Sequence, residues 1–485
     1  MKLVVLMSLA GFGVGCGGHA EPDPVVVGCV EVASIDDLSP VVDDSFAGTD
    51  LDGRWFLESP TASYQGNMWL ERQGSRLEIN HAYAIEGGDT RFSSLGKVRN
   101  TDGSFDEIVT EIANYRSDDT MRYETLSCAG GTCTRCTSKM IRATRFQGEA
   151  EADHLALVGE LGSGPTWSLG YTLNVRVAGT IAYLIRRDGL HVIETADPAH
   201  PVEVGFYTRM TLGVRNDLKL FDVGPRRFAV LADTPLDIVE VTDPRAPTLV
   251  SQIPEAAHTV FVEPRDGKVL AYLGSLDGTC PVYDLSDPGH PTKVGSFDAE
   301  ASYVHDLSVK DGIAYLNAWE KGFIVVDFTT PAAPRVLGTW ANTPLKASHS
   351  NWTTVAGGRH VALHGDEGYG AHLDVVDLDP ASPTFMQSIA SWQAQPWVSI
   401  HNIMAFGNKA YFAYYQDGIR VLDLSDPLHP AELGHYDTWD PQSAAASSEF
   451  FTGAFGLDVD LARKLVFVAD SPRGLVILAD QTADR

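Results

Sequence analysis

The stretch Gly418-Ile-Arg-Val-Leu-Asp-Leu-Ser-Asp-Pro-Leu-His-Pro430 decides the fold, because the chain repeats it. It consists of a short apolar run, an Asp-Pro pair and a second proline three residues later. Asp at the first position of a β-turn bonds back to the backbone, and Pro presets φ at the second. Short β-branched runs of this kind are typical of strands that are packed on both faces.

Related copies recur through the C-terminal two thirds of the chain. They occupy residues 189–201, 235–247, 278–291, 322–334 and 371–383, and an unfinished copy occupies 474–480. The first prolines of the six turns are 43 to 49 residues apart. A period of this size predicts a solenoid or a propeller, and four short strands per period describe one propeller blade. We therefore predict an all-β protein with a seven-bladed β-propeller over residues 151–485, preceded by a small antiparallel β domain.

The last copy lacks the proline turn and the outer strand that complete the others. Residues 154–161, HLALVGEL, resemble the outer-strand segment HPVEVGFY at 200–207. We expect residues 154–161 to pair with 474–480 as the outer strand of the last blade. Such closure would hide strand edges that otherwise invite aggregation.

The apolar run followed by S/T-D-P-x-x-P resembles the LVIVD repeat family of bacterial and archaeal surface proteins, over about residues 170–480. Cys280-Pro281 interrupts the third copy, and Thr330 replaces Asp in the fourth. The resemblance implies a β-propeller and a surface location. It implies no defined activity, since a fold does not determine a function.

The first 16 residues resemble a bacterial lipoprotein signal peptide. A positive start and an apolar run lead to Cys16, the residue that would be acylated. Gly13 stands where such signals usually carry Leu, and an ordinary cleaved signal peptide is the alternative. The expected location is the outer membrane or cell surface of a bacterial envelope, with the lipid anchor making the membrane a partner.

Two segments separate this signal from the repeats. Residues 17–50 are acidic and lack periodicity, so they predict a disordered tether. Residues 51–150 alternate apolar and polar side chains, which predicts a small antiparallel sheet or barrel with one solvent-exposed face. Gly53-Arg54-Trp55 resembles the start of a lipocalin over three residues only.

Four cysteines are candidates for disulfide bonds, namely Cys29, Cys128, Cys133 and Cys136. A structural zinc site needs four ligands, and no fourth Cys or His stands suitably near the last three. Outside the cytoplasm, disulfides are the expected state. Cys280 makes the count odd, and the pairing stays open.

Composition excludes some functions. The formal net charge of −28 argues against nucleic acid as a partner, because phosphates require Lys and Arg. The chain contains no G-x-S-x-G, H-E-x-x-H, P-loop or EF-hand motif.

One group of residues, all histidines, could bind a metal ion or take part in catalysis. Near the start of a blade's first strand stand His258, His305, His349 and His401. Because the innermost strands line a propeller channel, these imidazoles could converge and bind Cu, Zn or Fe. The alternative is a structural histidine whose ring bonds to the backbone of the neighbouring blade. No other cofactor is predicted.

Loop aromatics are the other candidates for contacts, namely Trp319, Trp352, Trp392, Trp397 and Trp439, beside an insertion at 437–453. Burial in the blade cores is the alternative for them. The expected function is a non-catalytic binding or scaffold protein for an envelope or extracellular protein or glycan. The alternatives are an extracytoplasmic metalloenzyme, an oxidase or hydrolase using the histidines, and ligand binding by residues 51–150.

Overall fold

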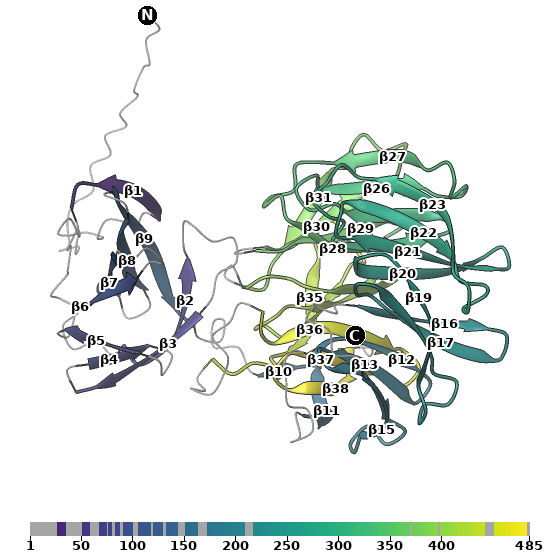
Figure 1. Cartoon of the computed structure of the whole chain (residues 1–485), viewed down its shortest axis with the longest axis horizontal. Helices are drawn as coiled ribbons and strands as arrows, with labels where there is room; N and C mark the ends of the chain where they lie inside the picture. Colours follow the sequence, from purple (N-terminus) through teal and green to yellow (C-terminus); the bar gives the residue numbers. More distant parts are fainter. Residues whose placement is uncertain are drawn as a thin grey trace, which may run out of the picture.

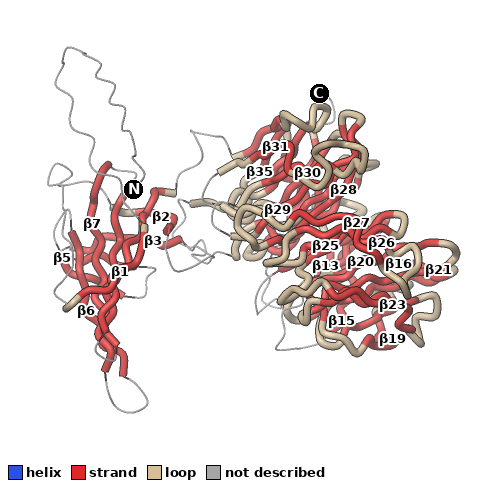
Figure 2. The backbone as a smooth tube through the Cα atoms, turned by 90° about the horizontal axis from the view of Figure 1, so that it is seen from above, coloured by secondary structure: helices blue, strands red, loops and turns tan. Residues whose placement is uncertain are grey.

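The computed structural model of this chain consists of β-strands and contains no α-helix among the residues it describes (Figures 1 and 2). Those residues are 27–34, 51–58, 67–74, 76–79, 83–87, 91–99, 105–117, 120–129, 132–143, 151–162, 172–208, 217–368, 371–395, 398–441 and 451–482. Within these ranges, no helix has the length and apolar composition needed to cross a membrane.

Seven antiparallel sheets follow one another around a ring and form a β-propeller, as the repeat predicts. The first three blades comprise β12 Thr172–Ala178, β13 Ile181–Arg186, β14 Gly189–Glu194 and β15 Val202–Thr208; β16 Leu218–Val223, β17 Arg226–Leu231, β18 Leu236–Glu240 and β19 Thr248–Ile253; and β20 Ala257–Arg265, β21 Lys268–Ser275, β22 Thr279–Asp284 and β23 Thr292–Asp298.

The remaining blades have the same antiparallel plan. They comprise β24 Asp306–Lys310, β25 Ile313–Asn317, β26 Phe323–Asp327 and β27 Arg335–Trp340; β28 Ser348–Ala356, β29 Arg359–Asp366, β30 Leu373–Asp377 and β31 Ser388–Trp392; β32 Ile403–Phe406, β33 Lys409–Ala413, β34 Ile419–Asp423, β35 Ala431–Tyr436 and the short β10 Ala152–Asp153; and β36 Ala454–Asp460, β37 Leu465–Asp470, β38 Gly474–Asp480 and β11 Leu155–Leu161.

The repeated motif forms the third strand of a blade and the turn after it. Phe323 to Val326 in β26 are all buried, which explains the continuous apolar run. In the turn, the Asp426 carboxylate accepts a hydrogen bond from the backbone N–H of Leu428 at 3.1 Å. The predicted turn chemistry is therefore confirmed.

The glycine of the outer strand is required by the packing of neighbouring blades. A Cβ on Gly205 would overlap the carbonyl oxygen of Pro244, in the turn of the next blade, and Gly295 meets Pro331 in the same way. Gly159 meets the turn at Pro198 of the first blade. In these three blades the outer strand therefore has the next blade's turn packed directly against its backbone.

The predicted closure of the ring is confirmed. Strand β11 pairs antiparallel with β38, from Leu155 opposite Asp480 to Leu161 opposite Leu475. The last blade is thus completed by a strand from before the first, while β10 adds a fifth strand to the sixth blade.

The region before the propeller is a separate antiparallel sheet (Figure 1). Its strands are β1 Gly28–Val32, β2 Gly53–Glu58, β3 Asn67–Gln73, β4 Arg76–Ile79, β5 Tyr83–Gly87, β6 Arg91–Arg99, β7 Phe105–Ser117, β8 Thr120–Ala129 and β9 Thr132–Arg142. Each strand from β2 to β9 pairs with the next one in the sequence, and β9 also pairs with β2. The strand pairings therefore form a closed ring.

The prediction of a disordered tether over residues 17–50 is wrong for Gly28–Val32. This segment forms β1, which pairs with β9, and a disulfide joins Cys29 to Cys136 across the two strands. A disulfide bond and a long partner strand hold a segment of five residues that is too short to indicate a strand by itself.

The sheet contacts the propeller through an arginine and three aromatic rings. The Arg54 guanidinium, 1% exposed, lies 5.5 Å from the ring centre of Trp69 and 5.3 Å from that of Trp439. The Phe56 ring lies 6.0 Å from Trp439. Trp439, at the start of the insertion after the sixth blade, is therefore buried between the two parts of the chain.

Candidate metal centre

A cavity of about 540 Å³ opens into the propeller channel. First strands of the blades and the turns that follow their second strands supply its walls, which include all four predicted histidines, His258, His305, His349 and His401. The volume lies within the range of small-molecule sites, roughly 300–1,000 Å³.

β-Bulges help to place histidines in the channel. In β20 the pairing with β21 jumps from Ala257 to Thr259, so that the strand register skips His258. In β28 the same irregularity leaves out His349. A bulge re-aims a side chain that regular alternation would turn to the other face. His305 and His401 stand directly before β24 and β32, where strand pairing begins.

The four rings form a continuous arc across four consecutive blades. The ring centres of His258 and His305 are 4.2 Å apart, those of His305 and His349 are 4.1 Å apart, and those of His349 and His401 are 4.6 Å apart. The predicted convergence is therefore present in the structure.

All four imidazoles are held neutral. Burial lowers the pKa of His258 and of His401 to about 4. Burial first, and then the neighbouring histidines, lower the pKa values of His305 and His349 well below the ordinary value. A neutral imidazole keeps a lone pair for a metal ion, which a protonated one lacks.

His401 has the hydrogen bond that the structural alternative requires. Its Nδ1 donates to the carbonyl oxygen of Phe455, in the next blade, at 2.6 Å. The proton is thereby assigned to Nδ1, which leaves the Nε2 lone pair unprotonated. Metal-ligating histidines are oriented in the same way by backbone carbonyls, so this bond is compatible with both roles.

His349 differs, because neither of its ring nitrogens makes a hydrogen bond of normal geometry in the described part of the chain, although a weaker contact with the backbone of His401 opposes the fall in its pKa. The residue is only 1% exposed, and Nδ1 of His305 is similarly unsatisfied. Burying a polar atom without a partner destabilises a protein by about 1–3 kcal/mol. A ligand that accepts these lone pairs would remove that penalty.

Glu367 completes the group, and the sequence did not indicate it. Its Oε1 lies 3.4 Å from His349 Nε2, and the Tyr415 hydroxyl donates a hydrogen bond to the same oxygen. One ligand atom from each of His305, His349 and Glu367 lies within 4.8 Å of the others. All three residues are buried.

A common position in the blades explains where Glu367 comes from. The turn after the second strand carries Glu367 in the fifth blade, Trp319 in the fourth and Tyr415 in the sixth. The Trp319 ring lies 5.3 Å from His305, and the Tyr415 ring lies 4.8 Å from His401. An alignment of this turn across the repeats could have identified Glu367 as a residue that faces the channel.

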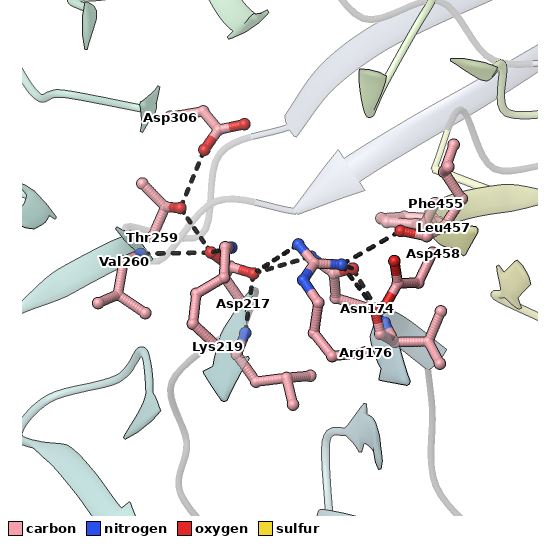
Figure 3. A network of polar contacts seen from close by, with 12 residues as sticks. Asn174, Arg176, Asp217, Lys219, Thr259, Val260, Asp306, Phe455, Leu457 and Asp458 are labelled. Atoms are coloured by element: carbon pink, nitrogen blue, oxygen red, sulfur yellow. Dashed lines mark hydrogen bonds and ion pairs between the residues drawn. The ribbon is translucent and has the colours of Figure 1, made fainter. Parts of the chain in front are cut away.

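A charged network occupies the opposite sector of the channel, in the first two blades (Figure 3). Asp217 pairs with Lys219 Nζ at 2.5 Å and with Arg176 at 3.5 Å, and accepts a hydrogen bond from Asn174 at 2.9 Å. Although burial opposes ionisation, these two cations lower the pKa of Asp217. Both cations are therefore committed to a carboxylate.

The network continues toward the histidines through Thr259. Its hydroxyl lies 2.8 Å from an Asp217 oxygen and 3.0 Å from an Asp306 oxygen. Burial, and then the charge of Asp217, raise the pKa of Asp306 to about 6. The hydroxyl can donate to only one carboxylate at a time, which agrees with a reduced acidity of the second.

The other predicted site residues are distributed as follows. Trp352 lines the cavity, and Trp392 packs beside Phe412 in the core. Disulfides join Cys29 to Cys136 and Cys128 to Cys133, and Cys280 is a buried free thiol. Cys16 and Trp397 lie outside the described residues.

Comparisons with known proteins support the repeat. Residues 169–209, 301–341 and 399–438 match the LVIVD repeat, so three such repeats are present. No protein of curated function matches the chain. The computationally designed protein Ika8 is 12% identical, with a TM-score of 0.46, over 67% of this chain and 99% of its own. The WD40 β-propeller domain of Doa1 is 12% identical, with a TM-score of 0.49, over 69% of this chain and 98% of its own.

Proposed function

We propose that the propeller channel is a transition-metal centre that acts on a small organic molecule. His305, His349 and Glu367 are the proposed ligands, with His258 and His401 at the two ends of the arc. The observation that carries the proposal is the buried His349, whose two ring nitrogens lack hydrogen bonds while the Glu367 carboxylate stands 3.4 Å away.

The types of ligand in this group limit which metal ions can bind. Two neutral imidazoles and one carboxylate are the ligands of catalytic zinc in several hydrolases and of ferrous iron in many oxygenases. Such sites keep a coordination position open for water or substrate. The adjoining cavity supplies space for one, since Glu367 and the histidines line it directly.

Metal analysis of untagged protein tests the proposal. We expect about one equivalent of zinc, iron or copper in the wild type and none in a His305→Ala/His349→Ala variant. Zinc would favour hydrolytic chemistry, and iron or copper would favour oxidative chemistry. Wild-type protein that is folded and metal-free, and that takes up none of the three ions on titration, would contradict the proposal.

A non-catalytic binding or scaffold role is the second candidate, and the hydrogen bond from His401 to Phe455 favours it. If every channel histidine joins neighbouring blades in this way, the arc stabilises the ring and the partner binds elsewhere. Envelope or extracellular proteins and glycans are then the proposed partners. Metal-free protein whose melting temperature falls on substitution of His305 would support this reading.

We also propose that the protein is exported and lipid-anchored at the outer membrane or cell surface through Cys16. The disulfides Cys29–Cys136 and Cys128–Cys133 support an oxidising compartment. Mass spectrometry of the N-terminal peptide from a bacterial host tests the anchor: a diacylglyceryl Cys16 is expected, and an unmodified cleaved N-terminus would contradict it.

A further inference from the structure

Arg187 occupies in the first blade the place that Glu367 occupies in the fifth. It stands in the turn directly after the second strand, and it lines the same cavity. Its side chain is exposed, and no acidic partner for it is found among the described residues. The two other cations of the cavity wall, Arg176 and Lys219, are paired with Asp217. Arg187 is therefore the cation of this wall left to receive an anion.

The ring order places Arg187 across the channel from the proposed metal ligands. The first blade contacts the second and the seventh, and contacts continue blade by blade around the ring. With seven blades, the fourth and fifth are three steps from the first in either direction. His305 and His349 belong to those two blades. A ligand that spans the cavity can therefore meet a guanidinium on one side and the histidines on the other.

The cavity wall also has an apolar and aromatic part. It includes Phe261, Leu276, Trp352, Met404, Phe451 and Phe455. Such a wall binds a hydrocarbon or aromatic body, because its burial contributes about 25 cal/mol per Å² of apolar surface.

We propose that the cavity takes a small arylalkyl carboxylate, with the carboxylate bound to Arg187, the aromatic ring against the aromatic wall and the far end toward the histidines. A carboxylate is favoured because one guanidinium can bind it through two parallel hydrogen bonds. A phosphate dianion would leave charge uncompensated on a single cation. The inference deepens the proposed function, but the contact with Arg187 does not itself need the metal.

Isothermal titration with 3-phenylpropionate and its neutral amide tests this contact in the full chain, both metal-free and zinc-loaded. We expect the acid to bind at least about tenfold more tightly than the amide. Arg187→Ala should remove that preference while leaving affinity for the amide and zinc content unchanged. Arg187→Lys should restore part of the preference, and Arg245→Ala, an exposed arginine on the proline turn of the second blade, should behave as wild type.

Equal affinities for acid and amide, unchanged acid binding in Arg187→Ala, or no binding of either compound would overturn the inference. Tighter binding of phenyl phosphate than of the acid would overturn the choice of a carboxylate. Acid binding that depends on Arg187 in protein unable to hold zinc would support this inference while contradicting the proposed metal centre. The experiment can therefore contradict the carboxylate site and the metal centre independently of each other.

Discussion

His349 Nε2 lies 3.4 Å from Glu367 Oε1, and the backbone holds the pair in place. The N–H of Glu367 donates to the carbonyl oxygen of Ala347 at 2.9 Å, so the turn that bears the carboxylate is tied to the strand that bears the imidazole. Metal sites on rigid strands are held more accurately than sites on free loops. The geometry of this pair is thus part of the blade itself.

Removal of the carboxylate charge should weaken metal binding without loosening the blade. Glu367→Gln keeps the backbone bond and the size of the side chain, so we expect zinc affinity to fall at least about tenfold at an unchanged melting temperature. Competition with a chromophoric chelator measures the affinity. Glu320→Gln, an exposed carboxylate in the equivalent turn of the fourth blade, is the control. Equal zinc affinity in the two variants would exclude Glu367 as a ligand.

The unpartnered imidazole should limit the stability of the metal-free protein. In His349→Leu an apolar side chain replaces two buried nitrogens that make no hydrogen bond, so we expect the metal-free melting temperature to stay level or rise. His401→Leu should lower it, because the buried carbonyl of Phe455 loses its donor. Calorimetry of both variants after chelator treatment makes the comparison. A larger loss in His349→Leu than in His401→Leu would favour a structural role for His349.

Ring closure should depend on the absence of a side chain at Gly159. A Cβ there would overlap the carbonyl oxygen of Pro198 and press on Ala199, so the outer strand of the last blade could not pack on the first. We expect Gly159→Ala to destabilise the propeller by about 1–3 kcal/mol, as overpacking commonly does. Gly28→Ala, with no atom within 4 Å of the added carbon, is the control. Urea titration monitored by tryptophan fluorescence measures both, and equal stabilities would contradict the packing argument.

The sequence predicted the propeller because its information is local and repeated. The proline turns and the buried third strands recur in nearly every blade, and an outer-strand glycine stands in five of the seven, including Gly159 in β11. The segment Gly28–Val32 was missed because its strand depends on β9 and on the bond between Cys29 and Cys136, which lie 107 residues apart. The local sequence around this segment gives no sign of the strand pairing or of the disulfide.

The candidate site was predicted only in part, for a similar reason. The histidines share a place in the repeat, so their convergence could be predicted, although the bulges that aim His258 and His349 could not. Glu367 belongs to no motif and stands where neighbouring blades carry Trp319 and Tyr415. Arg187 was missed at the same position. Residues that differ from blade to blade at this turn can be recognised as equivalent in position only when the blades are superposed.

The two disulfides should differ in their contribution to stability. Cys29–Cys136 closes a loop of 107 residues, whereas Cys128–Cys133 closes one of 5. By the chain-entropy argument, the first contributes about 5 kcal/mol and the second about 2 kcal/mol. We expect the double variant Cys29→Ala/Cys136→Ala to unfold the N-terminal sheet at lower urea than Cys128→Ala/Cys133→Ala. Circular dichroism during the titration compares them, and the reverse order would contradict the entropy argument.

A buried carboxyl in the last blade should make stability rise as pH falls toward 4, against the usual direction. Burial raises the pKa of Asp470 to about 6, while the unfolded chain titrates near 3.9. Above pH 6 the folded protein holds an unfavourable buried charge; below about pH 4 both states are protonated and the penalty is absent.

Asp470→Asn removes this charge and keeps the acceptor for the N–H of Arg473, 3.0 Å away. We therefore expect the variant to be more stable than wild type by about 1–3 kcal/mol at pH 8, with the difference vanishing toward pH 4. Asp298→Asn is the matched control, since the exposed Asp298 also accepts one backbone hydrogen bond, from Glu300 at 2.8 Å. Melting temperatures of the three proteins across this range give the answer. A difference independent of pH would show that Asp470 ionises at an ordinary pKa, and that its burial is compensated by neighbouring donors.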